Sequence, residues 1–300
     1  MIDLKYPAVH GFAHPAMGTT FEAMIAGCDL NYASQAAQAF FAEVDRLESL
    51  LSRFNASSEI SQINRLQPGN SMRIGIETYE CLTIADEVRR ETAGAFDINF
   101  RALQKSTGES IKKGIGIILS SSGGFSLAIE PGETRRGKTC LDLDLGGIGK
   151  GYTLDRAAHV FLDWDIDRSL LHSGTSTALA RGDAPGLDPG EKGWPVGAGT
   201  VSGLARPQSR LFLKDRALSG SGTEVKGQHI IDPRTGCPAD RHLAAWVSHP
   251  RAAVADALST AFMAMTLEEI ERYCDLHPEV WALIFTNDRA YRVLNEEIFV

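Results

Sequence analysis

Three oxygen-bearing side chains stand at helical spacing in the segment VADALSTAF, residues 254–262. On a helix, Asp256, Ser259 and Thr260 share one face, because positions i, i+3 and i+4 lie above one another. The apolar neighbours predict that this helix is largely buried, and a buried carboxylate needs a partner. A structural arginine or backbone amides would satisfy it. So would Mg²⁺, which typically takes one or two protein carboxylates together with water and substrate phosphate oxygens.

The segment LDLDLGGIGKGYTLD, residues 141–155, joins an alternating, strand-like run to a glycine-rich corner. It is not a Walker A loop, because Asp144 stands where that loop requires glycine and Gly151 stands where it requires Ser or Thr. Bare glycine backbone permits either a tight turn or the close approach of a large ligand. In the second case, N–H groups and Lys150 would face anionic oxygens. A plain turn is the commoner meaning of such a corner.

His229 precedes an apolar pair and the turn signal DPRTG. A histidine in this position is more often structural, but an imidazole with a near-neutral pKa also suits a general base. Core packing is likewise the default interpretation for Met17, Phe54 and Phe96, which stand next to glycine or polar turn residues.

The composition excludes several classes of protein. With 43% hydrophobic and 23% charged residues in 300, the chain is an ordinary globular protein with a substantial core. A net charge of −8 without a basic tract argues against nucleic acid as the main partner. The five cysteines are odd in number and form no C-x-x-C, which favours neither disulfides nor a zinc site and indicates a reducing compartment.

No secretory leader or membrane-spanning segment is evident in the sequence. We therefore expect the chain as written to be cytoplasmic. A periplasmic or membrane-anchored location would follow if a leader had been removed.

Hydrophobic periodicity predicts the elements that hold these residues in place. Helices are expected over residues 31–54, 77–92, 152–162 and 252–265, followed by a helix that a capping box opens at Thr266–Glu269. Strands are expected over 19–27, at the start of 141–155, near 196–202 and 210–218, and in hairpins at 114–131 and around 286–289. This irregular alternation of helices and hairpins favours an α+β fold with antiparallel sheets.

Taken together, the segments resemble the ApbE family of FAD:protein FMN transferases. The resemblance is carried, in the family's order, by AMGTTFEAMI, LLSRFNASSEISQIN, TAGAFD, DLGGIGKGYTLD, ALSGSG with HIIDPRTG, and ADALSTAF. Each segment alone is modest evidence, whereas six in order are specific. The resemblance implies a T-fold-like α+β domain over residues 1–300, with packed helices and an FAD cleft between two intimately packed halves.

The resemblance also implies roles for individual residues. The metal ligands would be Asp256, Ser259, Thr260 and the backbone carbonyl of Gly149. The FAD contacts would be Met17, Phe54, Ala95, Phe96, Asp97, Gly146, Tyr152 and Ile230. His229 would act in catalysis together with Asp256.

The implied activity is Mg²⁺-dependent transfer of FMN from FAD to a threonine or serine hydroxyl of an acceptor protein, with release of AMP. The sequence departs from the family's usual pattern at INFRAL after GAFD and at Ser221-Gly222. Two alternatives therefore stay open: a metal-dependent FAD pyrophosphatase, and a non-catalytic FAD-binding protein.

Overall fold

The computed structural model describes residues 9–104, 117–121, 124–129, 141–198, 211–223 and 230–299. Its largest element is an eight-stranded sheet whose neighbouring strands all pair antiparallel. In spatial order the strands are β1 (Val9–Ala16), β2 (Thr19–Ala26), β6 (Ser169–Ser173), β7 (Thr177–Arg181), β10 (Arg216–Gly222), β11 (His242–His249), β12 (Trp281–Thr286) and β13 (Tyr291–Leu294). The predicted α+β fold with antiparallel sheets is confirmed.

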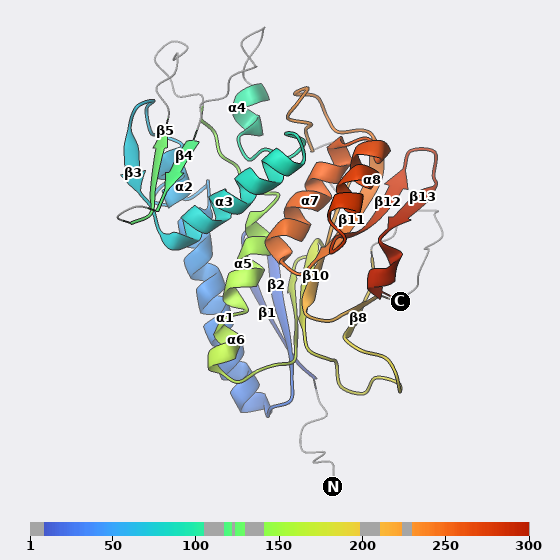
Figure 1. The fold of residues 1–300 in the computed structure, drawn as a ribbon. Coiled ribbons are helices and arrows are strands. Elements are labelled where there is room, and N and C mark those ends of the chain that lie inside the picture. The colour runs from blue at the N-terminus through green and yellow to red at the C-terminus, as the bar shows by residue number, and fades with distance from the viewer. Residues whose placement is uncertain are drawn as a thin grey trace.

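Helices cover one face of this sheet (Figure 1). The central ones are α1 (Leu30–Leu51), α5 (Gly149–Ala157) and α7 (Ala252–Ala264), and α3 (Ile76–Glu91) packs against α7. Strand alternation explains the packing, because Phe21, Ala23 and Ile25 all project from β2 into the core shared with α1. The helix α8 (Leu267–Leu276) follows α7, and its Thr266–Glu269 capping box is present as predicted.

A small hairpin lies over the other face of the sheet. It consists of β8 (Trp194–Val196) and β9 (Leu211–Leu213), whose apolar side chains share a core cluster with Leu170 and Leu218 of the large sheet. A separate three-stranded sheet contains β3 (Ser71–Arg73), β5 (Ser126–Ile129) and β4 (Ile117–Ser120). The shortest helices are α2 (Glu59–Ile63), α4 (Phe100–Gln104), α6 (Val160–Asp163) and the 3₁₀ helix η3 (Glu296–Phe299).

The strand predicted at the start of 141–155 is wrong. Residues 141–145 alternate between buried leucine and partly buried aspartate, but they belong to no strand of the described chain. Their backbone N–H groups bond to scattered partners instead: Asp144 N–H donates to the carbonyl oxygen of Ile98 at 2.7 Å, and Asp142 N–H donates to Asn99 Oδ1 at 2.9 Å. Leu143 N–H likewise donates to Asn64 Oδ1 at 2.7 Å. An extended segment held in this way has the alternating sequence pattern of a strand but lacks the hydrogen bonds to a neighbouring strand.

The other predicted elements lie close to their observed bounds. The helix expected over 152–162 begins earlier, at Gly149, and is divided into α5 and α6. The strand near 210–218 is two strands, because Asp215 adopts a φ of +51° between β9 and β10. Parts of the predicted hairpin 114–131 and of the strand 196–202 lie outside the described residues. Within the described residues, no helix combines the length and apolar character that a bilayer crossing requires.

Candidate active site

A cleft of about 940 Å³ opens at one end of the large sheet. Four parts of the sheet contribute to its wall: the β1–β2 turn at Met17, the β6–β7 turn at Thr175–Ser176, the last residues of β10, Gly220–Gly222, and the first half of β11. The glycine corner before α5, the middle of α7 and the segments around Phe54 and Phe96 also belong to the wall. Segments that are far apart in the sequence therefore meet at this cleft.

Asp256 is the buried acid of the cleft, with 4% of its surface exposed. Its Oδ2 accepts the N–H of Gly151 at 3.1 Å and lies 3.8 Å from the ammonium of Lys150. The contact requires α5 and α7 to touch: a Cβ on Gly151 would lie 2.2 Å from the carbonyl oxygen of Ala252. Gly151 is therefore needed for close approach of two helices, and that approach brings an amide and an ammonium to the carboxylate.

Hydroxyl groups surround Asp256 and bond to one another. Ser219 Oγ lies 3.4 Å from Asp256 Oδ1, and Ser221 Oγ lies 2.9 Å from Ser259 Oγ. Ser259 and Thr260 both donate to the backbone carbonyl of Asp256, at 2.9 and 3.3 Å. Ser221 and Thr260 line the cleft, whereas Ser259 is fully buried behind them. The wall thus offers oxygen atoms to a ligand or cation.

Two arginines form a second charged wall of the cleft. Arg53 donates to Asp144 Oδ2 at 2.8 Å and to Asp142 Oδ1 at 3.1 Å. Arg101 lies 3.6 Å from Asp144. These arginines were not predicted as site residues, because no local pattern in the sequence links residues 53, 101 and 144. The one available signal was the position of Arg53 beside Phe54.

Phe54 projects at the rim of the cleft with 89% of its surface exposed, and the Arg53 guanidinium carbon lies 5.4 Å from its ring centre. An exposed aromatic face at a cleft suits stacking by a flat ring. Unlike Phe54, Ala95 and Phe96 of the cleft wall are buried. Burial also raises the pKa of the carboxyl group of their neighbour Asp97.

The structure brings most of the predicted site residues to this single cleft: Met17, Phe54, Ala95, Phe96, Asp97, Gly146, Gly149, Ile230, Asp256 and Thr260 line it. Ser259 lies behind its wall. Tyr152 is 2% exposed, and its hydroxyl donates to Glu80 Oε2 at 2.9 Å. His229 lies outside the described residues. The roles of these residues stay predictions.

A divalent cation fits the donor set around Asp256. In the part of the chain that the structure describes, no three His, Cys, Asp or Glu side chains come together as a metal cluster. Magnesium needs no such cluster, because it usually combines one or two carboxylates with neutral oxygens and water. Asp256, the Thr260 hydroxyl and the glycine-corner carbonyls provide oxygens of this kind on the cleft wall.

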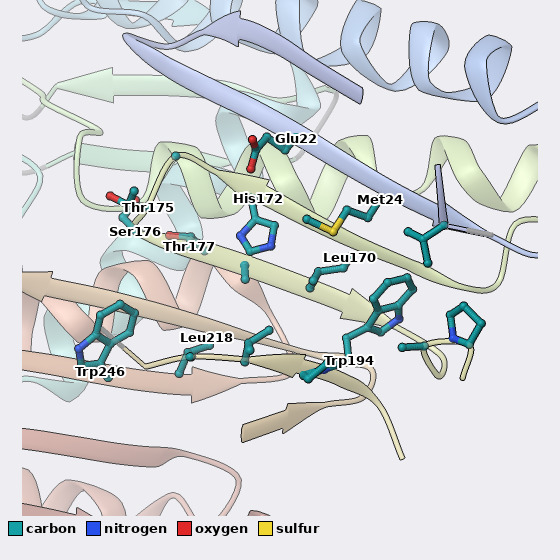
Figure 2. A pocket seen from close by; sticks show the side chains of 18 residues that line it. Glu22, Met24, Leu170, His172, Thr175, Ser176, Thr177, Trp194, Leu218 and Trp246 are labelled. Atoms are coloured by element: carbon teal, nitrogen blue, oxygen red, sulfur yellow. The ribbon is translucent and has the colours of Figure 1, made fainter. Parts of the chain in front are cut away.

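A second cavity, of about 690 Å³, lies against the sheet face that carries the β8–β9 hairpin (Figure 2). We call it the sheet-face cavity. Its wall is mostly apolar and includes Trp194, Trp246 and Leu218. Glu22 and His172 face each other there across β2 and β6, and burial lowers the pKa of His172 despite the Glu22 carboxylate, which raises it.

Comparison with known proteins connects this architecture to flavin transfer. An FAD:protein FMN transferase of Escherichia coli is 24% identical over 276 residues, which span 84% of this chain and 77% of that protein. A protein of the same name from Treponema pallidum is 28% identical over 165 residues, but this match spans only 51% of the chain and 46% of the Treponema protein.

Solved structures establish the same fold over the whole chain. The apo flavinyl transferase ApbE of Pseudomonas stutzeri superposes with a TM-score of 0.78 at 20% identity, covering 100% of both chains. The ApbE protein of Thermotoga maritima gives a TM-score of 0.77 at 22% identity, covering 97% of this chain and 99% of the other. Residues 17–284 match the model of the ApbE family, and the chain therefore belongs to the ApbE family.

Proposed function

We propose that this protein transfers FMN from FAD to a threonine or serine hydroxyl of an acceptor protein and releases AMP. Membership of the ApbE family supports the proposal, as do the FAD:protein FMN transferases among its relatives. The observation that carries it furthest is the buried carboxylate of Asp256, which lies beside a bare glycine corner in a cleft of about 940 Å³. A pyrophosphate bound there would meet positive charge from Lys150 and a wall of hydroxyl groups.

In this reaction, one phosphorus–oxygen bond forms and one breaks. The acceptor oxygen attacks the phosphorus of the FMN half, and the bond from that phosphorus to the AMP oxygen breaks. His229 takes the proton of the acceptor hydroxyl. When bound by Asp256, Thr260 and the Gly149 carbonyl, Mg²⁺ would supply charge neutralisation for the pyrophosphate and the leaving group.

The remaining residues of the cleft bind and orient the nucleotide. A Cβ on Gly147 would lie 3.1 Å from Thr260 Oγ1 and 3.3 Å from the Phe96 ring, so glycine lets the corner pack closely against these two residues of the cleft wall. The exposed ring of Phe54 would stack on a flat ring of FAD. Positioning and charge neutralisation are the main protein contributions to phosphoryl transfer.

Incubation of the purified protein with FAD, Mg²⁺ and a peptide acceptor tests the proposal by mass spectrometry. An acceptor heavier by one FMN, with AMP in equal amount, is the expected result. Free FMN and AMP without modified acceptor would identify a pyrophosphatase instead, and unchanged bound FAD would identify a binding protein. The His229→Gly variant should still bind FAD but lose transfer; unchanged transfer would remove His229 from the mechanism.

A further inference from the structure

Lys150 occupies an unusual position for a cation. It is the second residue of α5, whose first turn contains no acidic residue. The amino-terminal end of a helix carries partial positive charge, so a lysine there is disfavoured unless other groups hold it. Two groups do: its ammonium donates to the carbonyl oxygen of Gly146 at 2.8 Å and lies 3.8 Å from Asp256 Oδ2.

These contacts place the ammonium directly beside the oxygen that a divalent cation would use. Asp256 is 4% exposed, and its two oxygens are already approached from the protein side by Gly151 N–H and Ser219 Oγ. Lys150 approaches from the cleft, which it lines together with Gly146. A cation bound to the same carboxylate from the cleft would lie within a few ångströms of the ammonium and be repelled by it.

We propose that Lys150 competes with the divalent cation for Asp256 and, when both cation and FAD are bound, turns its ammonium to the pyrophosphate. This inference rests on the proposed function. Lys150 then has opposite effects on the two ligands: it weakens binding of the cation alone and strengthens binding of FAD. Because the same side chain links the two sites, each ligand favours the other.

The competition is measurable without turnover, using Mn²⁺ as the probe in electron paramagnetic resonance titrations of the full-length protein. Lys150→Met should bind Mn²⁺ about tenfold more tightly than wild type in the absence of FAD, since removing one charge near a divalent ion is an effect of this size. With saturating Mn²⁺ and no acceptor protein, the same variant should bind FAD several-fold more weakly by fluorescence quenching. Lys150→Arg, which keeps the charge, should stay within about threefold of wild type in both assays.

Two control variants distinguish a failure of the Lys150 proposal from a failure of the metal assignment to Asp256. Lys192 is exposed and does not line the cleft, so Lys192→Met makes the same change in net charge and should leave both affinities unchanged. Unaltered or weaker Mn²⁺ binding by Lys150→Met would overturn the competition. Asp256→Ala should abolish Mn²⁺ binding; if it does not, the metal assignment of the proposed function fails, whatever the behaviour of Lys150.

Discussion

The cleft and the sheet-face cavity are comparable in volume, about 940 and 690 Å³, and they share Thr175, Ser176 and Trp246 in their walls. Their chemistry differs. The cleft gathers Asp256, Lys150 and a set of hydroxyl groups, whereas the sheet-face cavity pairs one carboxylate with one neutral imidazole among tryptophan and aliphatic side chains. Only the cleft has the charges and oxygen donors that a metal-assisted pyrophosphate reaction needs.

The difference follows from where each cavity lies on the same sheet. The sheet-face cavity uses side chains that alternate along strands, and alternation on a covered face selects apolar residues. The cleft uses turns and strand ends, where glycine and polar side chains are tolerated, together with the helix α7 that brings Asp256. Chemistry, more than volume, therefore favours the cleft as the candidate active site.

Matched removal of one charge from each region is the strongest test of this comparison. Asp256→Asn should lower kcat/KM for FMN transfer on the order of 1,000-fold or more, because it removes the charge proposed to hold the cation. Glu22→Gln, in the sheet-face cavity, should stay within about twofold, because that carboxylate is exposed and outside the cleft. Similar losses in the two variants would contradict the assignment of chemistry to the cleft.

The glycine corner gives the second test, this time of stability. A Cβ at Gly151 would lie 2.2 Å from the Ala252 carbonyl oxygen, so Gly151→Ala must separate α5 from α7. We expect the free energy of unfolding to fall by about 3 kcal/mol in urea titrations, with loss of activity.

Gly149→Ala is the matched control, because its Cβ would make an ordinary 3.4 Å contact with Leu145 inside the same wall. Its stability should be unchanged or raised by up to about 1 kcal/mol, since alanine favours a helix over glycine. Equal stability of the two variants would show that the corner tolerates separation of the helices.

The sequence predicted the helices better than the sheet. Amphipathic spacing located α1, α3 and α7 within a few residues, and the capping box located the start of α8. The expectations did not include β1, whose pattern of exposed and half-buried residues lacks an apolar face. The alternation in 141–145 is that of a strand, but the side chains of Asn64 and Asn99 bond to this backbone where a neighbouring strand would, and alternation alone cannot distinguish the two cases.

The roles of the site residues stay predictions, but local motifs explain which of these residues the sequence could group together. Asp256 and Thr260 share a helix face and Gly146 and Gly149 share a corner, and the structure brings both pairs to one cleft. Arg53 and Arg101 could not be found, because they reach the cleft through ion pairs with Asp142 and Asp144 that only the tertiary fold creates. Spacing along a chain reports neighbours on one element, not neighbours across elements.

Acid pH should affect the large sheet more than the described wall of the cleft, because the imidazoles of His172 and His249, whose pKa values are lowered, lie on strands and not in that wall. Burial lowers the pKa of His249 from 6.5 to about 4, and its Nδ1 accepts the N–H of Arg251 at 2.9 Å. Between these pH values the unfolded chain binds a proton that the folded state refuses, so stability is lost as pH falls. The loss should approach about 3 kcal/mol.

Urea titrations from pH 7.5 to 4.5 measure this loss. His249→Gln should remove most of the dependence, and His172→Gln a smaller part, because the pKa of His172 is also lowered by burial. An unchanged slope in both variants would mean that other groups control acid stability.

The smallest expected effect concerns the hydroxyl groups of Thr177 and Ser219, which connect the sheet-face cavity to Asp256 in the cleft. Thr177 lines the sheet-face cavity and is 2% exposed, and its Oγ1 lies 2.9 Å from Ser219 Oγ, which in turn approaches Asp256. Thr177→Val keeps the shape and removes one hydrogen bond, so the free energy of unfolding should fall by about 1 kcal/mol, with kcat nearly unchanged.

Ser221→Ala, in the cleft, should affect kcat more than stability, because the Ser221 hydroxyl lies on the cleft wall, bonds Ser259 and lies 3.4 Å from Thr260. We expect a several-fold loss of kcat with little loss of stability. A fall in kcat for Thr177→Val as large as that for Ser221→Ala would show that these hydroxyl groups transmit the state of the sheet-face cavity to Asp256, and the two regions would then have to be treated as one site.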